Sequence, residues 1–276
     1  MGRLNGARGE MTGGLPYNAI GAGPPVLVLQ GLTFGNRALR GFETRFGLGP
    51  FRELALHRRV FVINRRPGMA RGTTLSEMAA DYAAVIERDF QPPVDVIGLS
   101  SGGTIAFYLA AEHPRLVRRL VLEDAGPRLT AAGQEFAATV GPLAEAGRWR
   151  EVSQVFMGLV QPENALGRAT GWLFSPLMAR GAPSDPDEML ALLEAEAAHD
   201  FTPRLGEIEA PTLVLSGELE FMVAGRPVTA AAGSVLVVRP QTVHSARVLG
   251  DTPVDTINVL SPRRTREVAF TALEIG

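Results

Sequence analysis

Short runs of consecutive apolar residues recur along the first half of the chain, each with the length of a β-strand. Four of them are Val26–Leu29, Val60–Ile63, Val94–Ile97, which Asp95 interrupts, and Leu120–Leu122, and Leu15–Ile20 is a candidate for a further short strand. Because a continuous apolar run is typical of a strand buried on both faces, we predict a sheet that is covered on both sides.

Helical patterns lie between these runs. Residues Thr74–Glu77, with the sequence TLSE, have the form of a capping box and predict a helix that continues to about Asp89. Further helices are expected at Phe51–His57 and directly after Ser100. Strands that alternate with helices at this spacing predict a parallel sheet with right-handed crossovers.

The pattern changes after about Pro127. Residues 130–200 are almost entirely helix-like, and Asp185–Glu188 predicts a helix start with Pro186 at its first position. The sheet resumes at Pro211–Gly217. We therefore predict an α/β core with an inserted helical cap. The expected domains are a flexible leader at 1–14, a core at 15–126 and 206–276, and a helical cap at 127–205.

Composition narrows the class of protein further. With 276 residues, of which 46% are hydrophobic, the chain can build one large core. The net charge of −2 gives no basic surface for nucleic acid, and no apolar run is long enough to span a membrane. The absence of cysteine excludes disulfides and thiolate metal sites. We therefore expect a cytoplasmic protein without nucleic-acid or membrane partners.

The most informative stretch is Gly98–Gly102, with the sequence GLSSG, between a predicted strand and a predicted helix. It matches G-x-S-x-G, the pattern of a nucleophile elbow, in which a serine occupies a strained turn from strand to helix. The turn needs small neighbours, which Gly98, Gly102 and Gly103 supply. The free N–H groups of the helix N-terminus would then point at the reacting centre.

From about Tyr17 to Gly217 the chain resembles the α/β-hydrolase superfamily. The motifs that carry the resemblance are GAGPPVLVLQG, VIGLSSGG, AAEHPRLVRRLVLED and, after the helical insert, EIEAPTLVLSG. The resemblance implies a mostly parallel sheet with a helical cap, and it implies no cofactor. It is less specific for the substrate, since the superfamily includes esterases, lactonases, C–C hydrolases, dehalogenases and perhydrolases.

The resemblance also assigns the nucleophile and the oxyanion donors. Ser100 matches the nucleophile, and the backbone N–H groups of Ser101 and Leu32 match the two donors that hold the oxyanion. Many relatives have His-Gly before the second donor, where this chain has Gln30-Gly31. Because the donor is a backbone N–H, the difference need not disturb the site, and we expect Gln30 to order the loop by a hydrogen bond.

The chain has four histidines, and a general base must reach the serine hydroxyl. His113 lies thirteen residues along the helix that Ser100 starts, about 20 Å away, and is excluded. His57 is expected on the surface at the opposite end of the sheet, and His199 is expected to be a solvated residue at a helix end. His244 follows an apolar strand and a proline turn and matches the family's catalytic histidine.

Three carboxylates are candidates for the acid that orients this histidine. In the family the acid follows the strand that ends here at Leu215–Gly217, in a G-x-x-D pattern, and Glu220 takes the aspartate's place. Asp124, at the end of the preceding strand, is the alternative, although a loop carboxylate that caps nearby N–H groups is the simpler interpretation. Glu218 is a third and weaker candidate.

The C-terminal part departs from the hydrolase pattern. Residues 216–263 resemble part of a cupin barrel, since Glu218 lies seven residues before Gly225, and Gly233 lies eleven before His244, as in the two cupin motifs. The H-x-H that would supply two further metal ligands is missing. We therefore expect a β-rich replacement of the usual hydrolase C-terminus, without a bound metal.

Together these assignments predict a serine hydrolase that acts on a small carboxylic ester through an acyl-enzyme. Two alternatives stay open: a binding protein of the same fold whose triad is weakened by the altered C-terminus, and a metal-dependent, cupin-type activity at His244 and Glu218. For the serine hydrolase, the expected partner is a small, mainly apolar substrate. Apolar cap residues that could contact it, unless they form the core of the cap, are Trp172, Leu173, Phe174 and Met178.

Overall fold

The part of the chain that carries the fold is described almost without interruption. The computed structural model describes residues 6–41, 43–160, 175–176, 179, 181–215, 219–223, 226–230 and 244–248. For residues 159–160, residue 215 and the three C-terminal strands, it describes the backbone alone.

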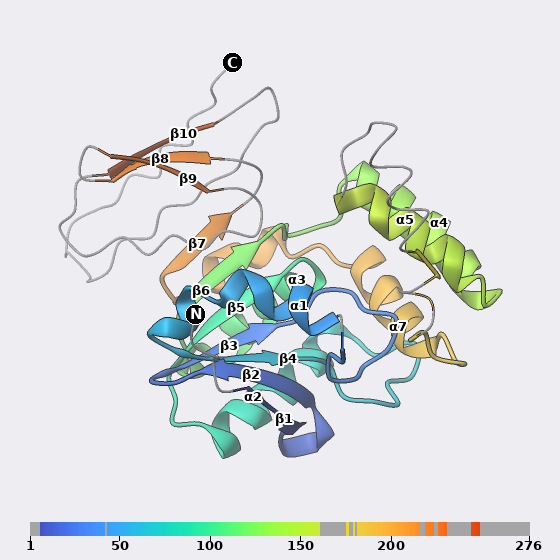
Figure 1. Cartoon of the computed structure of the whole chain (residues 1–276), viewed down its shortest axis with the longest axis horizontal. Helices are drawn as coiled ribbons and strands as arrows, with labels where there is room; N and C mark the ends of the chain where they lie inside the picture. The colour runs from blue at the N-terminus through green and yellow to red at the C-terminus, as the bar shows by residue number, and fades with distance from the viewer. Residues whose placement is uncertain are drawn as a thin grey trace.

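A seven-stranded sheet forms the centre of the molecule (Figure 1). Its order is β1-β2-β4-β3-β5-β6-β7; the β1–β2 and β2–β4 pairs are antiparallel and the other pairs are parallel. The four apolar runs of the sequence lie in β3, β4, β5 and β6, and the mostly parallel sheet is confirmed. The strands are β1 (Ala7–Glu10), β2 (Pro16–Gly21), β3 (Pro25–Leu29), β4 (Arg59–Ile63), β5 (Val94–Leu99), β6 (Val117–Glu123) and β7 (Thr212–Leu215).

The N-terminal segment differs from its expected form. Where the sequence predicts a flexible leader, Ala7–Glu10 forms the edge strand β1 and pairs with β2. Thr12 then donates from its N–H and its hydroxyl to the Asp89 carboxylate, at 2.7 and 3.0 Å. Main-chain hydrogen bonds hold this strand, and its burial is only partial, so its residues carry no apolar pattern by which the sequence could reveal it.

The helices α2 (Leu75–Asp89) and α3 (Ser101–Glu112) cover one face of the sheet. Thr74 caps α2 as predicted: its hydroxyl accepts from the Glu77 N–H, and the Glu77 carboxylate accepts from the Thr74 N–H at 2.7 Å. Side chains along β3 point alternately to the two faces of the sheet, and Leu27 and Leu29 face these helices. The resulting core is continuous from β6 to Tyr82, which is completely buried.

The opposite face is covered by shorter elements. Val26 and Val28 pack there against two 3₁₀ turns, Gly49–Phe51 and Leu54–Leu56, which follow the short helix α1 (Glu43–Leu48). The sequence predicts one helix at Phe51–His57, and this prediction is wrong in helix type. The second of these turns is closed by i→i+3 bonds, such as His57 N–H to the Leu54 carbonyl at 3.1 Å, and it ends with one i→i+4 bond, from the Arg58 N–H to the same carbonyl at 3.0 Å.

The helices α4 (Ala131–Glu145), α5 (Trp149–Val160) and α7 (Asp187–Ala197) lie between β6 and β7. They share an apolar cluster of their own, apart from the two clusters of the sheet. In Figure 1, α4 and α5 lie together at the upper right and α7 lies between them and the sheet region. Among the described residues, none of the helices has the length and apolar character needed to cross a membrane.

The helix α7 is tied to the sheet at its first turn. It begins one residue later than the sequence predicts, with Pro186 at the N-cap, and Asp185 accepts from the Asp187 N–H at 2.9 Å. The Glu188 carboxylate does not fold back onto this cap. It accepts instead from the N–H groups of Asn36 and Gly68, at 2.5 and 2.6 Å, in the loops that follow β3 and β4.

The C-terminal strands form a second sheet. The strands β8 (Leu219–Val223), β9 (Arg226–Ala230) and β10 (His244–Val248) pair antiparallel in the order β10-β8-β9. Figure 1 shows this sheet at the upper left, beyond the end of β7. The described C-terminus is therefore β-rich, as the sequence predicts.

Candidate active site

Ser100 occupies the turn between β5 and α3. Its backbone has φ 47° and ψ −120°, a conformation that residues with a side chain rarely adopt. The turn is held from two sides: the Ser100 N–H donates to the Glu123 carbonyl at 2.7 Å, and the Ser100 carbonyl accepts from the Gly103 N–H at 2.7 Å. The Ser100 side chain is exposed at the carboxyl edge of the parallel strands.

Glycine is required on both sides of this turn. A Cβ atom at Gly102 would lie 2.1 Å from the Leu29 carbonyl oxygen, and one at Gly98 would lie 2.5 Å from the Gly103 Cα. A Cβ atom at Gly103 would lie 2.3 Å from the Ala125 Cβ. The close packing that the motif implies is therefore present, and the backbone of α3 begins directly against the end of β3.

The loop after β3 comes next to Ser100. A Cβ atom at Gly31 would lie 3.5 Å from the Ser100 Cβ. The N–H of Leu32 has no hydrogen-bond acceptor among the described residues, and the N–H of Ser101, at the start of α3, has no partner within its helix. The structure thus brings Ser100, Ser101 and Leu32 to one edge of the sheet, with two backbone donors at hand.

The backbone of Gln30 orders this loop. Its N–H donates to the Ile63 carbonyl at 3.1 Å, and its carbonyl accepts from the Arg65 guanidinium at 2.9 Å. Arg65 is only 2% exposed, and it also donates to the Gly31 carbonyl and to the Thr33 hydroxyl. Burial lowers the pKa of Arg65. No sequence motif identifies this arginine, because Arg65 follows a strand in a stretch that looks like an ordinary polar loop.

Glu196 is a second buried ionisable residue that no sequence motif identifies. Glu196 of α7 is 5% exposed, and its carboxylate accepts from the Ser101 hydroxyl at 2.9 Å and from the Thr104 hydroxyl at 2.8 Å. Burial raises the pKa of Glu196, while these two hydrogen bonds and the charge of Arg65 act in the opposite direction. No motif links Glu196 to the elbow, since the contact joins two elements that are far apart in the sequence.

Of the candidate acids, Asp124 lies at the same edge as Ser100. It directly follows Glu123, whose backbone pairs in register with Leu99, and it has φ 50° and an exposed side chain. The left-handed backbone of Asp124 is tolerated because short polar residues reach this region at lower cost than others.

The other predicted residues belong to the second sheet. Glu220 lies on β8 opposite Arg247, and His244 lies on β10 opposite Val223. The structure describes only the backbone of Glu220 and His244. Glu218 and the cap residues lie outside the described residues altogether; these cap residues are Trp172, Leu173, Phe174 and Met178. The triad and the metal-site alternative therefore stay predictions.

The remaining histidines divide between confirmed and wrong predictions. His57 is exposed, as expected. His113 ends α3 at its C-cap, on the far side from Ser100. His199, however, is 6% exposed rather than solvated, with its Nδ1 3.2 Å from the Tyr108 hydroxyl. Burial lowers the pKa of His199. The sequence shows only that this residue follows a helix and cannot show that the rings of Tyr108 and Phe201 cover it.

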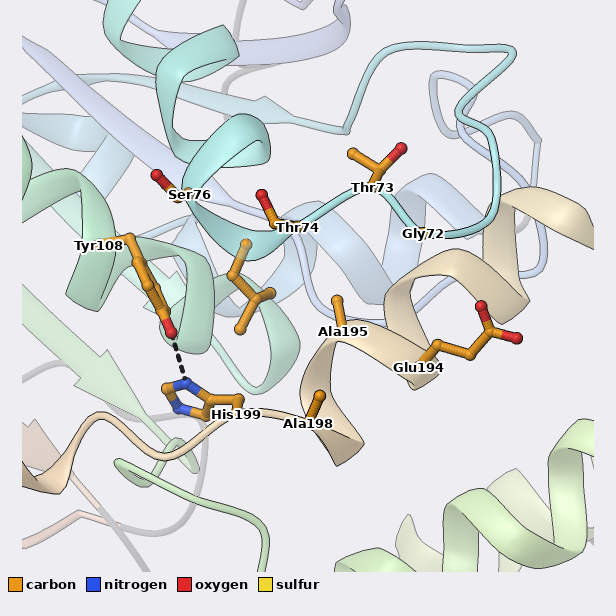
Figure 2. Close-up of a pocket in the computed structure, with 10 residues that line it drawn as sticks. Gly72, Thr73, Thr74, Ser76, Tyr108, Glu194, Ala195, Ala198 and His199 are labelled. Carbon is orange, nitrogen blue, oxygen red and sulfur yellow. Dashed lines mark hydrogen bonds between the residues drawn. The ribbon is translucent and has the colours of Figure 1, made fainter.

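A pocket of about 290 Å³ lies beside this histidine (Figure 2). It is bounded by Gly72–Ser76, by Tyr108 of α3 and by the end of α7, and Figure 2 shows the hydrogen bond between Tyr108 and His199 at one side. Neither Ser100 nor Leu32 lines it. The pocket is therefore separate from the elbow.

The mostly parallel sheet and the strained serine turn define the α/β-hydrolase fold, and the chain belongs to this family. The model of the alpha/beta hydrolase fold matches residues 24–226, and that of the cupin domain matches residues 207–260. Both parts of the resemblance seen in the sequence are confirmed.

Individual relatives differ in the reactions that their names state. The chain is 34% identical over 151 residues to a pimeloyl-[acyl-carrier protein] methyl ester esterase of Neisseria meningitidis, covering 51% of this chain and 56% of that protein. It is 31% identical over 153 residues to a 2-hydroxy-6-oxo-2,4-heptadienoate hydrolase of Pseudomonas putida, covering 51% of each. The chain thus spans about half the length of these curated relatives.

A solved structure supports the fold. The esterase EaEST from Exiguobacterium antarcticum superposes with a TM-score of 0.58 at 20% identity, over 77% of this chain and 81% of that one. At this identity the likeness concerns the fold alone.

Proposed function

We propose that the protein is a serine hydrolase that cleaves a small carboxylic ester through an acyl-enzyme. The observation that carries the proposal is the exposed Ser100 on its strained turn, beside the backbone N–H groups of Leu32 and Ser101, which have no backbone acceptor in the described part of the chain. A nucleophile and oxyanion donors in one place are the minimum that acyl transfer needs.

The proposed reaction follows the Ser–His–acid scheme. The Ser100 Oγ attacks the ester carbonyl carbon while His244 takes its proton, and the oxyanion that forms is held by the N–H groups of Leu32 and Ser101. When the intermediate collapses, His244 returns the proton to the leaving alcohol. Water, activated by the same histidine, then releases the acid and restores Ser100. Glu220 is assigned to orient His244, with Asp124 as the alternative acid.

The helices between β6 and β7 are proposed to form a cap over this site, within a domain that spans residues 127–205. The contact of Glu196 with Ser101 supports it, because this contact joins α7 to the first turn of the elbow helix. Phe34, two residues after Leu32, packs on Trp149 and Phe156 with ring centroids 5.5 and 5.4 Å apart. An apolar wall beside the oxyanion donor favours an apolar acyl or alcohol group.

The test is covalent labelling of the full chain with a fluorophosphonate probe, together with hydrolysis of p-nitrophenyl acetate. We expect labelling at Ser100, its loss in Ser100→Ala, and unchanged labelling in Ser76→Ala, a matched serine in the first turn of α2. A folded wild-type protein that neither reacts with the probe nor hydrolyses the ester would contradict the proposal and favour a binding protein of the same fold.

A further inference from the structure

We propose that Arg65 is a positioning residue of the oxyanion hole: it holds the Gly31–Leu32 peptide so that the Leu32 N–H faces the reacting centre. The inference rests on the proposed function, and it adds to it a residue that no sequence motif of the elbow includes. Three observations carry it: the hydrogen bonds of the guanidinium, the geometry of one peptide unit, and the independent anchoring of the rest of the loop.

The guanidinium binds the part of the loop that precedes the donor. Nη1 of Arg65 donates to the Gln30 carbonyl at 2.9 Å and to the Gly31 carbonyl at 3.2 Å, and Nη2 donates to the Gly31 carbonyl at 3.2 Å. Nη2 also donates to the Thr33 hydroxyl at 3.1 Å. The Gly31 carbonyl thus receives both arms of the planar fork, which is a geometry that a lysine ammonium cannot reproduce.

The Gly31 carbonyl and the Leu32 N–H belong to the same peptide unit. A trans peptide is planar, and its C=O and N–H bonds point in opposite directions. Because Arg65 draws the Gly31 carbonyl toward the buried side of the loop, the Leu32 N–H is turned away from Arg65. Gly31 itself lies against Ser100, so the hydrogen-bond donor is turned out of the core beside the nucleophile.

The rest of the loop has a separate anchor. The Asn64 side-chain amide donates to the Thr33 hydroxyl at 3.3 Å, to the Gly35 carbonyl at 3.3 Å and to the Arg37 carbonyl at 3.1 Å. It makes no contact with the Gly31 carbonyl. Loss of Arg65 should therefore leave the loop attached to the sheet while it frees the one peptide that presents the donor.

Ser101, whose N–H is the second proposed donor, is bound by Glu196, a residue of opposite charge to Arg65. Glu196 accepts from the Ser101 hydroxyl, next to the backbone N–H that is assigned to the oxyanion. A buried guanidinium is costly, and the Nε of Arg65 has no acceptor among the described residues. The carboxylate of Glu196 compensates part of this charge. Arg65 thus binds the backbone on one side of the proposed oxyanion hole, and Glu196 binds the side chains of Ser101 and Thr104 on the other.

The test uses the full chain and the variants Arg65→Lys and Arg65→Met. Active sites are titrated with the fluorophosphonate, so that misfolded protein is not counted, and kcat and KM are measured for a p-nitrophenyl ester. We expect kcat per titrated site to fall about 10- to 100-fold, since one oxyanion donor is worth about 10²–10³-fold, with KM changed less than about 3-fold. Affinity for a boronic acid, which forms a tetrahedral adduct with the serine, should weaken in parallel.

Arg118→Gln is the matched control, because Arg118 pairs with Asp95 on the surface at the other end of β5 and β6. If Arg65→Met does not fold, Arg65→Lys decides. Variants with a lowered Tm but wild-type kcat per titrated site would overturn the proposal and leave Arg65 a purely structural residue. A wild-type protein that is not labelled at all would instead overturn the proposed function, and this inference with it.

Discussion

The two halves of the proposed catalytic triad lie in differently built parts of the molecule. Ser100 lies at the junction of β5 and α3, at the carboxyl edge of the parallel strands, where neighbouring backbone atoms leave room only for glycine on both sides of it. Glu220 and His244 lie on β8 and β10, which hydrogen-bond to each other in a separate antiparallel sheet.

The difference shows which half of the site depends on local structure. The elbow needs five consecutive residues between β5 and α3, with β3 and β6 on either side of β5. The fold of the sheet alone therefore places Ser100. Among the described strands, no hydrogen-bond ladder joins the second sheet to the first. An approach of His244 to Ser100 would therefore depend on packing between two sheets and on the chain that connects them.

The strongest test of this comparison replaces the histidines. His244→Ala should lower kcat by about 10⁴-fold or more, because loss of the general base removes the step that activates the serine. His199→Ala should lower the Tm, since this side chain is buried against Tyr108, but leave kcat within a few-fold. His57→Ala, at an exposed site, should change neither. Wild-type kcat in His244→Ala would break the assignment of the base to the second sheet.

The second test decides between the acids of the two sheets. Glu220→Gln should reduce kcat by about 10³–10⁴-fold, as expected when the group that orients the histidine is neutralised. Asp124→Asn should reduce it less than about 10-fold, and asparagine accepts the left-handed backbone of this position. A larger loss of kcat in Asp124→Asn than in Glu220→Gln would assign the role of the acid to Asp124, next to the elbow.

The third test concerns the steric basis of the elbow. Gly102→Ala places a Cβ atom 2.1 Å from the Leu29 carbonyl oxygen, so we expect a loss of about 3 kcal/mol or more in the free energy of unfolding. Gly158→Ala is the matched control, because a Cβ there meets nothing within 4 Å inside α5. It should stabilise the protein by roughly 0.5–1 kcal/mol. Chemical denaturation measures both, and equal effects would contradict the steric argument.

The smallest expected effect is on the pH dependence of stability. The pKa of Glu196 is raised in the folded protein, so its contribution is present below its ordinary value of 4.5 and is lost as pH rises through the raised value. Relative to Glu196→Gln, the wild-type Tm should therefore decline with rising pH over this range. Glu207, whose pKa Arg204 lowers, should show the opposite sign in Glu207→Gln. Parallel melting curves for both variants would contradict the assignment.

Much of the fold could be predicted because parallel strands are buried on both faces. Val26–Leu29 and Val60–Ile63 are recognisable in the sequence as unbroken apolar runs. The cap of α2 is recognisable too, because Thr74 and its partner Glu77 are only three residues apart. The edge strand β1 could not be predicted, since its hydrogen bonds involve only the main chain and its residues are polar or small. The burial of His199 depends on Tyr108, which is remote in the sequence.

The candidate site divides in the same way. Ser100 and its glycines form one short motif, so the sequence identifies them together. Arg65, in the loop after β4, binds the loop after β3, and Glu196 of α7 binds Ser101 at the elbow; only the folded chain brings these residues together. No periodicity or spacing connects such residues, and their buried charges become evident only from their exposed fractions.

The attachment of α7 has a consequence for how this protein could diversify. Three carboxylates of this helix bind the core: Glu188 binds the loops after β3 and β4, Glu194 binds Arg71 in the second of these loops, and Glu196 binds Ser101 at the elbow. We therefore expect changes at Glu196 of α7 to affect the first turn of the elbow helix α3, whereas α4 and α5 carry no such carboxylate to the elbow among the described residues. In evolutionary terms, we expect α4 and α5 to tolerate changes in sequence with less effect on the elbow than α7.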